Sequence, residues 1–165
     1  MCFLENKLQM EKIKNLDKLL NSTDINDSII EIYFFVCKIC DYGNNFDAVT
    51  KPQKYIYLNR WFENQINNGG FGQYFFNSNS DVIHQTVDSL RIIGANTTAD
   101  MLQKAIDQLP NKTIPDTYDE RMNVFEQIGK TEREMWNELD KKFYEYPDDL
   151  CTLNFEYIKQ NRNGF

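Results

Sequence analysis

The spacing of apolar residues is the feature of this sequence that most limits its possible folds. Apolar side chains recur three and four positions apart in nearly every segment, and strict alternation over the length of a strand is almost absent. A repeat of three and four places side chains on one face of an α-helix, whereas alternation places them on one face of a strand. The sequence therefore predicts an all-α protein.

The length and composition indicate one compact body. The chain has 165 residues, of which 41% are hydrophobic and 14% aromatic. This length is typical of one domain, and the composition is too apolar for a disordered chain. No tract rich in Pro, Ser or Gly marks a linker. We expect a single-domain bundle of about seven to eight helices, with an N-terminal helix in residues 1–24 and the main helical domain in residues 25–165.

Capping residues mark where the helices begin. Three segments match the capping box, in which a Thr and a residue three positions later satisfy each other's free amides: Thr50-Lys51-Pro52-Gln53, Thr117–Glu120 and Thr131–Glu134. Other helices are expected to begin near Asp24 or Asp27, Ser80 or Asp81, Thr97 or Thr98, and Pro147-Asp148-Asp149.

The apolar spacing also predicts which side chains face the core. The N-terminal helix carries the stripe Leu4, Leu8, Ile13, Leu16 and Leu20. Later helices are expected to bury Met122 and Phe125, then Met135, Leu139 and Phe143. These assignments follow from the helical period alone.

The stretch NQINNGGFGQYFFNSNSD, residues 64–81, raises the question of a phosphate-binding loop. It lacks the Gly-Lys-Ser/Thr ending of a Walker loop, and Phe75 stands where a dinucleotide fingerprint needs its third glycine. We therefore interpret it as a helix that ends at Gly69 with a left-handed cap, followed by a short aromatic helix that packs in the core. The residues of this structural motif are Asn68, Gly69, Gly70, Phe71, Tyr74 and Phe75.

Candidate catalytic and metal-binding residues are few. Cys37 and Cys40 have the spacing of a redox or metal pair, but they lie in an apolar helical segment and are expected in the core. His84 is the only histidine, and no nucleophile motif accompanies it. We expect no catalytic residue, cofactor or metal. The alternative is a small-molecule enzyme whose pocket is lined by Tyr55, Trp61, Tyr74 and His84.

The charge limits the possible partners. The formal net charge is −7, and 14 of the 25 acidic residues lie in residues 96–165. An acidic surface repels phosphates, so we expect no direct nucleic-acid binding and a basic protein as partner. Moderate acidity is also the ordinary solubility setting of small proteins. No membrane span or export signal is recognisable in the sequence. The four cysteines are consistent with free thiols in a reducing compartment, so we expect a cytoplasmic protein.

The glycine stretch resembles the signature of a bacterial family of domains of unknown function whose best-known member is a DNA-mimic protein. The matching residues are Asn68-Gly69-Gly70-Phe71, Gln73-Tyr74-Phe75 and Asn77-Ser78, followed by Leu90, Ile93-Gly94-Ala95, Leu139-Asp140, Phe143-Tyr144 and Tyr157-Ile158. The resemblance covers about residues 25 to 161, so the N-terminal helix lies outside it. It implies an all-helical, often dimeric domain whose acidic surface occupies the DNA-binding face of a transcription regulator.

Acidic residues near the apolar stripe of the penultimate helix are the candidates for such a surface. They are Glu126, Glu134, Glu138, Glu145, Asp148 and Asp149. Basic residues interleave with them, and Glu138 with Lys142 forms a favourable pair that would cancel part of the field. Besides this interaction protein, which we rank above the enzyme, we consider a scaffold module that binds proteins through Trp61, Phe76 and Trp136.

Overall fold

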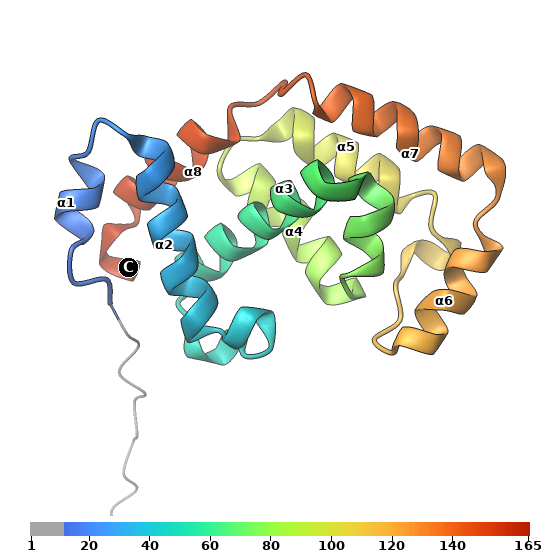
Figure 1. Ribbon diagram of the computed structural model, residues 1–165, viewed down its shortest axis with the longest axis horizontal. Helices are drawn as coiled ribbons and strands as arrows, with labels where there is room; N and C mark the ends of the chain where they lie inside the picture. The colour runs from blue at the N-terminus through green and yellow to red at the C-terminus, as the bar shows by residue number, and fades with distance from the viewer. Residues whose placement is uncertain (1–11) are drawn as a thin grey trace, which may run out of the picture.

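The structure is a computed structural model that describes residues 12–165, and in that range it is all-α, as predicted (Figure 1). Its eight α-helices are α1 (Leu16–Leu20), α2 (Ile25–Ile39), α3 (Lys51–Phe76), α4 (Ser80–Ile92), α5 (Asn96–Ile106), α6 (Tyr118–Gln127), α7 (Lys130–Phe143) and α8 (Leu150–Gln160). Short 3-10 helices are η1 (Asp41–Gly43), η2 (Phe46–Ala48), η3 (Pro110–Lys112) and η4 (Arg162–Gly164). None of the described helices is long and apolar enough to cross a bilayer.

The long helix α3 is the centre of the fold, and it contacts α2, α4, α7 and α8 (Figure 1). Its side chains Phe62, Ile66, Phe71, Tyr74 and Phe75 are completely buried and belong to the main apolar cluster, which α4, α5 and α7 complete. In Figure 1, α6 lies at the edge of the molecule, at the far end from α1 and α8.

One of the three predicted capping boxes is complete, and a second is present only in part. At the start of α3, the Gln53 amide donates to the Thr50 hydroxyl at 3.2 Å, and the Gln53 side chain accepts from the Thr50 amide at 2.9 Å. Thr117 caps α6 by accepting from the Glu120 amide at 3.4 Å, but the Glu120 carboxylate accepts from the Thr117 hydroxyl at 2.6 Å, so the reciprocal half of this box is missing. The third prediction was wrong, because the extended backbone of Gly129 starts α7 at Lys130 and places Thr131 inside the first turn.

Other helix starts were predicted with mixed success. Asp24 and Asp149 cap α2 and α8 as expected. For α4 the cap is Asn79, which accepts from the Val82 amide at 3.0 Å, so neither Ser80 nor Asp81 was correct. For α5 the helix already begins at Asn96, before both predicted threonines.

Two methionines predicted in the core are exposed. Met122 is 37% exposed and Met135 is 43% exposed. In α7 the buried stripe is Trp136, Leu139 and Phe143, which turns Met135 outward. The Trp136 indole donates to the Ala105 carbonyl at 3.0 Å, so the largest side chain of α7 fixes which face meets α5.

The N-terminal part packs on the same body as the rest of the chain. Ile13, Leu16 and Leu19 are buried in a small cluster with Ile158 and Phe165. The helix α1 is short, and Leu19 is buried where Leu20 was expected. The predicted stripe residues Leu4 and Leu8 lie outside the described residues.

Candidate functional site

The glycine pair makes a sharp bend inside α3. Gly69 has an extended backbone, with φ of −175°, and Gly70 has φ of 73° and ψ of −170°. The predicted break of the helix is therefore present, but the positive φ belongs to Gly70 and not to Gly69. After the bend, Phe71, Tyr74 and Phe75 are completely buried, as predicted. The motif serves the packing of two helical segments.

Asp140 of α7 occupies the place where a phosphate would bind at this bend. Its carboxylate accepts from the Phe71 amide at 2.9 Å, and this amide is one of the free amides at the start of the second helical segment. Burial raises the pKa of Asp140, and the hydrogen bond from Phe71 opposes this rise. A carboxylate supplied by the chain itself thus satisfies the anion-binding position.

Of the predicted partner-binding acids, Glu134 and Glu138 are paired with lysines. The Glu134 carboxylate lies 3.5 Å from the Lys130 ammonium, and the Glu138 carboxylate lies 2.6 Å from the Lys141 ammonium. The spacing predicted Lys142 as the partner of Glu138, but the partner is Lys141. The Lys141 partner holds the pKa of Glu138 below its ordinary value. These ion pairs reduce the negative field of α7.

The other predicted acids divide into two groups. Asp148 accepts from the amide and hydroxyl of Thr98 at 2.7 and 2.8 Å, so it supplies the cap of α5. Asp149 accepts from the Thr152 amide at 3.0 Å, which lowers the pKa of Asp149. Glu126 and Glu145 are exposed and form no ion pair with the residues described.

The loop before α6 and α6 itself carry acids that have no basic partner in residues 12–165. Asp116, Asp119, Glu120 and Glu126 are all exposed. Asp116 also lines a shallow hollow together with Asp81 of α4. We call these five residues the α6 acidic surface. The sequence interpretation included only Glu126, because the acids at the start of the helix were explained as capping residues.

The only basic residue in the segment 116–127 turns away from this surface. The Arg121 Nη1 donates to the Ser78 carbonyl at 3.2 Å, and the side chain is half-buried. Arg121 therefore does not offset the negative charge of the α6 acidic surface, whereas lysines offset Glu134 and Glu138 on α7.

A buried polar network joins α3 to α8 and α4. The Asn59 side chain donates to the Asn154 side chain at 3.0 Å and accepts from the Ser89 hydroxyl at 2.6 Å. Asn154 also donates to the Leu150 carbonyl at 2.8 Å. All three polar side chains are completely buried and mutually satisfied.

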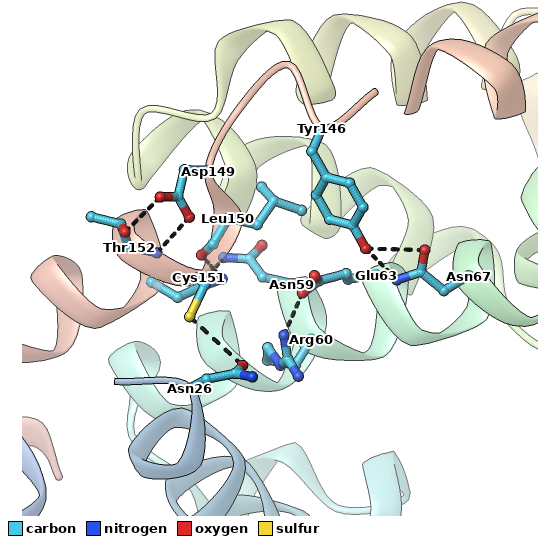
Figure 2. A network of polar contacts seen from close by, with 11 residues as sticks. Asn26, Asn59, Arg60, Glu63, Asn67, Tyr146, Asp149, Leu150, Cys151 and Thr152 are labelled. Carbon is cyan, nitrogen blue, oxygen red and sulfur yellow. Dashed lines mark hydrogen bonds and ion pairs between the residues drawn. The ribbon is translucent and has the colours of Figure 1, made fainter. Parts of the chain in front are cut away.

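Beside this network lies an ion pair between Arg60 and Glu63, both on α3. Figure 2 shows the pair beside the contact between Cys151 of α8 and Asn26 of α2. Burial raises the pKa of Glu63, and Arg60 opposes the rise. Neither the polar network nor the ion pair was predicted from the sequence. A signal was available, because Asn59, Arg60 and Glu63 lie between apolar residues of a helix that other elements cover on several sides.

The structure separates the four residues of the alternative enzyme pocket around His84. His84 is exposed, and its ring nitrogen lies 3.1 Å from the Lys112 carbonyl oxygen. Tyr74 is completely buried, and Tyr55 packs against Tyr157. The four proposed pocket residues therefore do not face a common cavity, because the helical period directs them to different sides of the bundle.

The Cys37 and Cys40 thiols are buried in the core, as predicted. Burial raises the pKa of both thiols, which keeps them protonated and weakly reactive. Within residues 12–165, no cluster of three or more His, Cys, Asp or Glu side chains is arranged to hold a metal ion.

Comparison with known proteins gives one match. A family model described as DMP19-like protein matches residues 47–161. The match covers the bend at Gly70, the α6 acidic surface and the buried network, and it begins later than residue 25, where the resemblance was expected to begin. No curated protein and no solved structure gives a significant match.

Proposed function

Because the chain belongs to the DMP19-like protein family, we propose that it is a protein-interaction domain whose acidic surface binds a basic, DNA-binding protein. The observation that carries this proposal is the α6 acidic surface, where Asp81, Asp116, Asp119, Glu120 and Glu126 are exposed and have no basic partner among residues 12–165. The resemblance to a family with a DNA-mimic member supports the same class of partner.

The spacing of the acids suits a partner that recognises phosphates. Asp119 and Glu126 are seven residues apart on α6 and lie on one helix face, about 10 Å apart along the axis. Phosphates of one DNA strand advance by about 3.4 Å each, so the two carboxylates span about three phosphate steps. Arginine and lysine side chains of a DNA-binding face would meet carboxylates in place of phosphates.

The acids of α7 and of the segment that follows it have a lesser part in this proposal. Glu145 is exposed and unpaired in the described structure and extends the negative field. Glu134 and Glu138 are offset by lysines, and Asp148 and Asp149 are engaged at helix starts. Neutralising these four should weaken partner binding less than neutralising the α6 acidic surface.

A charge-matched pair of triple variants tests the proposal. The first carries Asp116→Asn, Asp119→Asn and Glu126→Gln, and the control carries Asp27→Asn, Asp47→Asn and Asp88→Asn. All six carboxylates are exposed and form no ion pair in residues 12–165, so both variants change the net charge equally.

Basic proteins captured from the host extract by the wild-type chain would be identified, purified and titrated with each variant. We expect the first triple variant, and not the control, to lose most of the binding, and we expect duplex DNA to compete for the same partner. Raising the salt from about 0.05 M to about 0.3 M should weaken the complex, because screening shortens the range of the field. Equal binding by both variants, or a complex that duplex DNA leaves intact, would contradict the proposal.

A scaffold function remains the second candidate, with a different aromatic surface. Trp136 is buried and cannot form part of it, which corrects the set expected from the sequence. Instead, α6 exposes Tyr118, with 59% of its surface accessible, next to Met122. A homodimer formed through this patch would dissociate in a Tyr118→Ser, Met122→Ser variant, and sedimentation equilibrium measures that directly.

A further inference from the structure

A small cavity lies on the inner side of α6, away from its acidic surface. Its volume is about 160 Å³, and its walls come from η1, η2, α3, the segment 77–79, α4 and α6. The residues that matter for its chemistry are Tyr57, Trp61, Asn77, Asn79 and Arg121. A cavity of about 150 Å³ holds a benzene molecule, so this one has room for a single small ring.

The cationic group of the cavity has an unused donor edge. Arg121 Nη1 donates to the Ser78 carbonyl, while Nε is buried and has no hydrogen-bond partner in the described structure. No carboxylate in residues 12–165 forms an ion pair with Arg121, although the chain carries an excess of seven negative charges. A buried guanidinium edge without an acceptor is unfavourable, and a planar anion would satisfy it through two parallel hydrogen bonds.

Two asparagines supplement this edge. Asn79 uses its side-chain oxygen to accept from the Val82 amide, which leaves its NH₂ group as a donor. Asn77 donates to Gln65 at 2.7 Å and keeps its oxygen as an acceptor. The cavity thus offers donors beyond the arginine and one acceptor, a set that suits a carboxylate with a polar ring substituent.

The aromatic wall of the cavity is fixed before any ligand binds. The Tyr57 and Trp61 rings are nearly parallel, with an interplanar angle of 8° and 6.3 Å between centroids. The Tyr57 hydroxyl donates to the Tyr42 carbonyl at 2.7 Å. At Gly43, which has φ of 94°, a Cβ atom would lie 2.5 Å from the Tyr57 hydroxyl oxygen, so glycine permits this close approach. A flat ring would meet a rigid apolar surface here.

We propose that this cavity binds a small aromatic carboxylate. The carboxylate accepts hydrogen bonds from the free edge of Arg121, and the ring lies against Trp61. A second hollow of about 170 Å³ shares Gly43 and Asn79 with the first and is lined by both Lys54 and Asp81, so a longer acid would meet a carboxylate as well as a cation there. The Arg121 side of this site lies away from Asp119 and Glu126, because Arg121 is on the opposite side of α6 from these two acids.

Benzoate is the probe for the test, and benzamide is the uncharged control of the same shape. The chain has two tryptophans, so a Trp136→Phe background leaves Trp61 as the only tryptophan reporter. We expect benzoate to change the Trp61 fluorescence saturably and to bind at least about tenfold more tightly than benzamide, because a charge-assisted hydrogen bond is lost with the amide. Equal affinity for the two probes, or no benzoate binding, would overturn the proposal.

Variants separate the site from nonspecific binding. Arg121→Gln should weaken benzoate binding at least about tenfold, whereas Arg91→Gln, which removes an exposed arginine paired with Asp100, should leave it unchanged. If Arg121→Gln does not fold, Val82→Phe provides the second variant, since it fills the cavity and keeps the arginine. Undiminished benzoate binding in a folded Arg121→Gln or Val82→Phe protein contradicts the assignment.

Discussion

The bend in α3 depends on Gly70 because both its backbone angles and its surroundings exclude a side chain. Its φ of 73° with ψ of −170° is essentially restricted to glycine, and a Cβ atom would collide with the Asp140 carboxylate. We expect Gly70→Ala to lower the free energy of unfolding by about 3 kcal/mol or more. The matched control is Gly72→Ala, whose Cβ would lie 3.8 Å from Trp136 in a regular helix and should stabilise by up to about 1 kcal/mol. Urea unfolding measures both, and similar effects of the two substitutions would refute this account of the bend.

Asp140 should make the free energy of unfolding fall as the pH rises. A surface carboxylate with a lowered pKa, such as Glu138, has the opposite effect. Burial raises its pKa above the unfolded value of 3.8, so folding favours the protonated form. The stability that Asp140 contributes is fully present below pH 3.8, and it is lost as the pH rises through the pKa of Asp140 in the folded protein. Relative to Asp140→Asn, the wild type should therefore lose stability as the pH rises from 3.8 through the folded pKa of Asp140. Urea titrations across this range check the sign, and a constant difference between the two proteins would be inconsistent with it.

Among the helices, local patterns were enough where the cause is local. The Thr50 and Gln53 capping box was predictable because both partners lie within one turn. The start of α5 was not predictable, because its cap is Asp148, which is 50 residues away in sequence. The candidate surface was only partly predictable for the same reason. The sequence shows that Arg121 is basic, but only the packing of α6 shows that it turns inward and leaves the neighbouring acids unpaired.

The helix α6 should be the first of the long helices to open. It has no fully buried residue, and its attachments include the ring contacts of Phe76 with Tyr118 and Phe125 and the bond from Arg133 to the Phe125 carbonyl. Hydrogen exchange reports local opening through loss of amide protection. We expect amides of residues 123–127 to exchange at least about 100-fold faster than those of residues 56–66 in the same sample. Equal protection of the two segments would show that α6 opens only when the whole molecule unfolds.

The free energy of unfolding of the whole molecule should depend on the buried Arg60–Glu63 pair, because α3 is the helix on which the other elements pack. The two side chains are only 11% and 10% exposed. Glu63→Ala leaves the arginine charge buried without a partner, and we expect a loss of about 3–5 kcal/mol. Replacing the pair by Arg60→Met and Glu63→Leu removes both charges and should restore stability to within about 1 kcal/mol of the wild type. The exposed pair Lys141–Glu138 is the control, where Glu138→Ala should change the free energy of unfolding far less than Glu63→Ala, because solvent screens this pair. Denaturant unfolding distinguishes these cases: a double variant as unstable as Glu63→Ala would mean that the pair contributes specific geometry to α3 that apolar packing cannot replace.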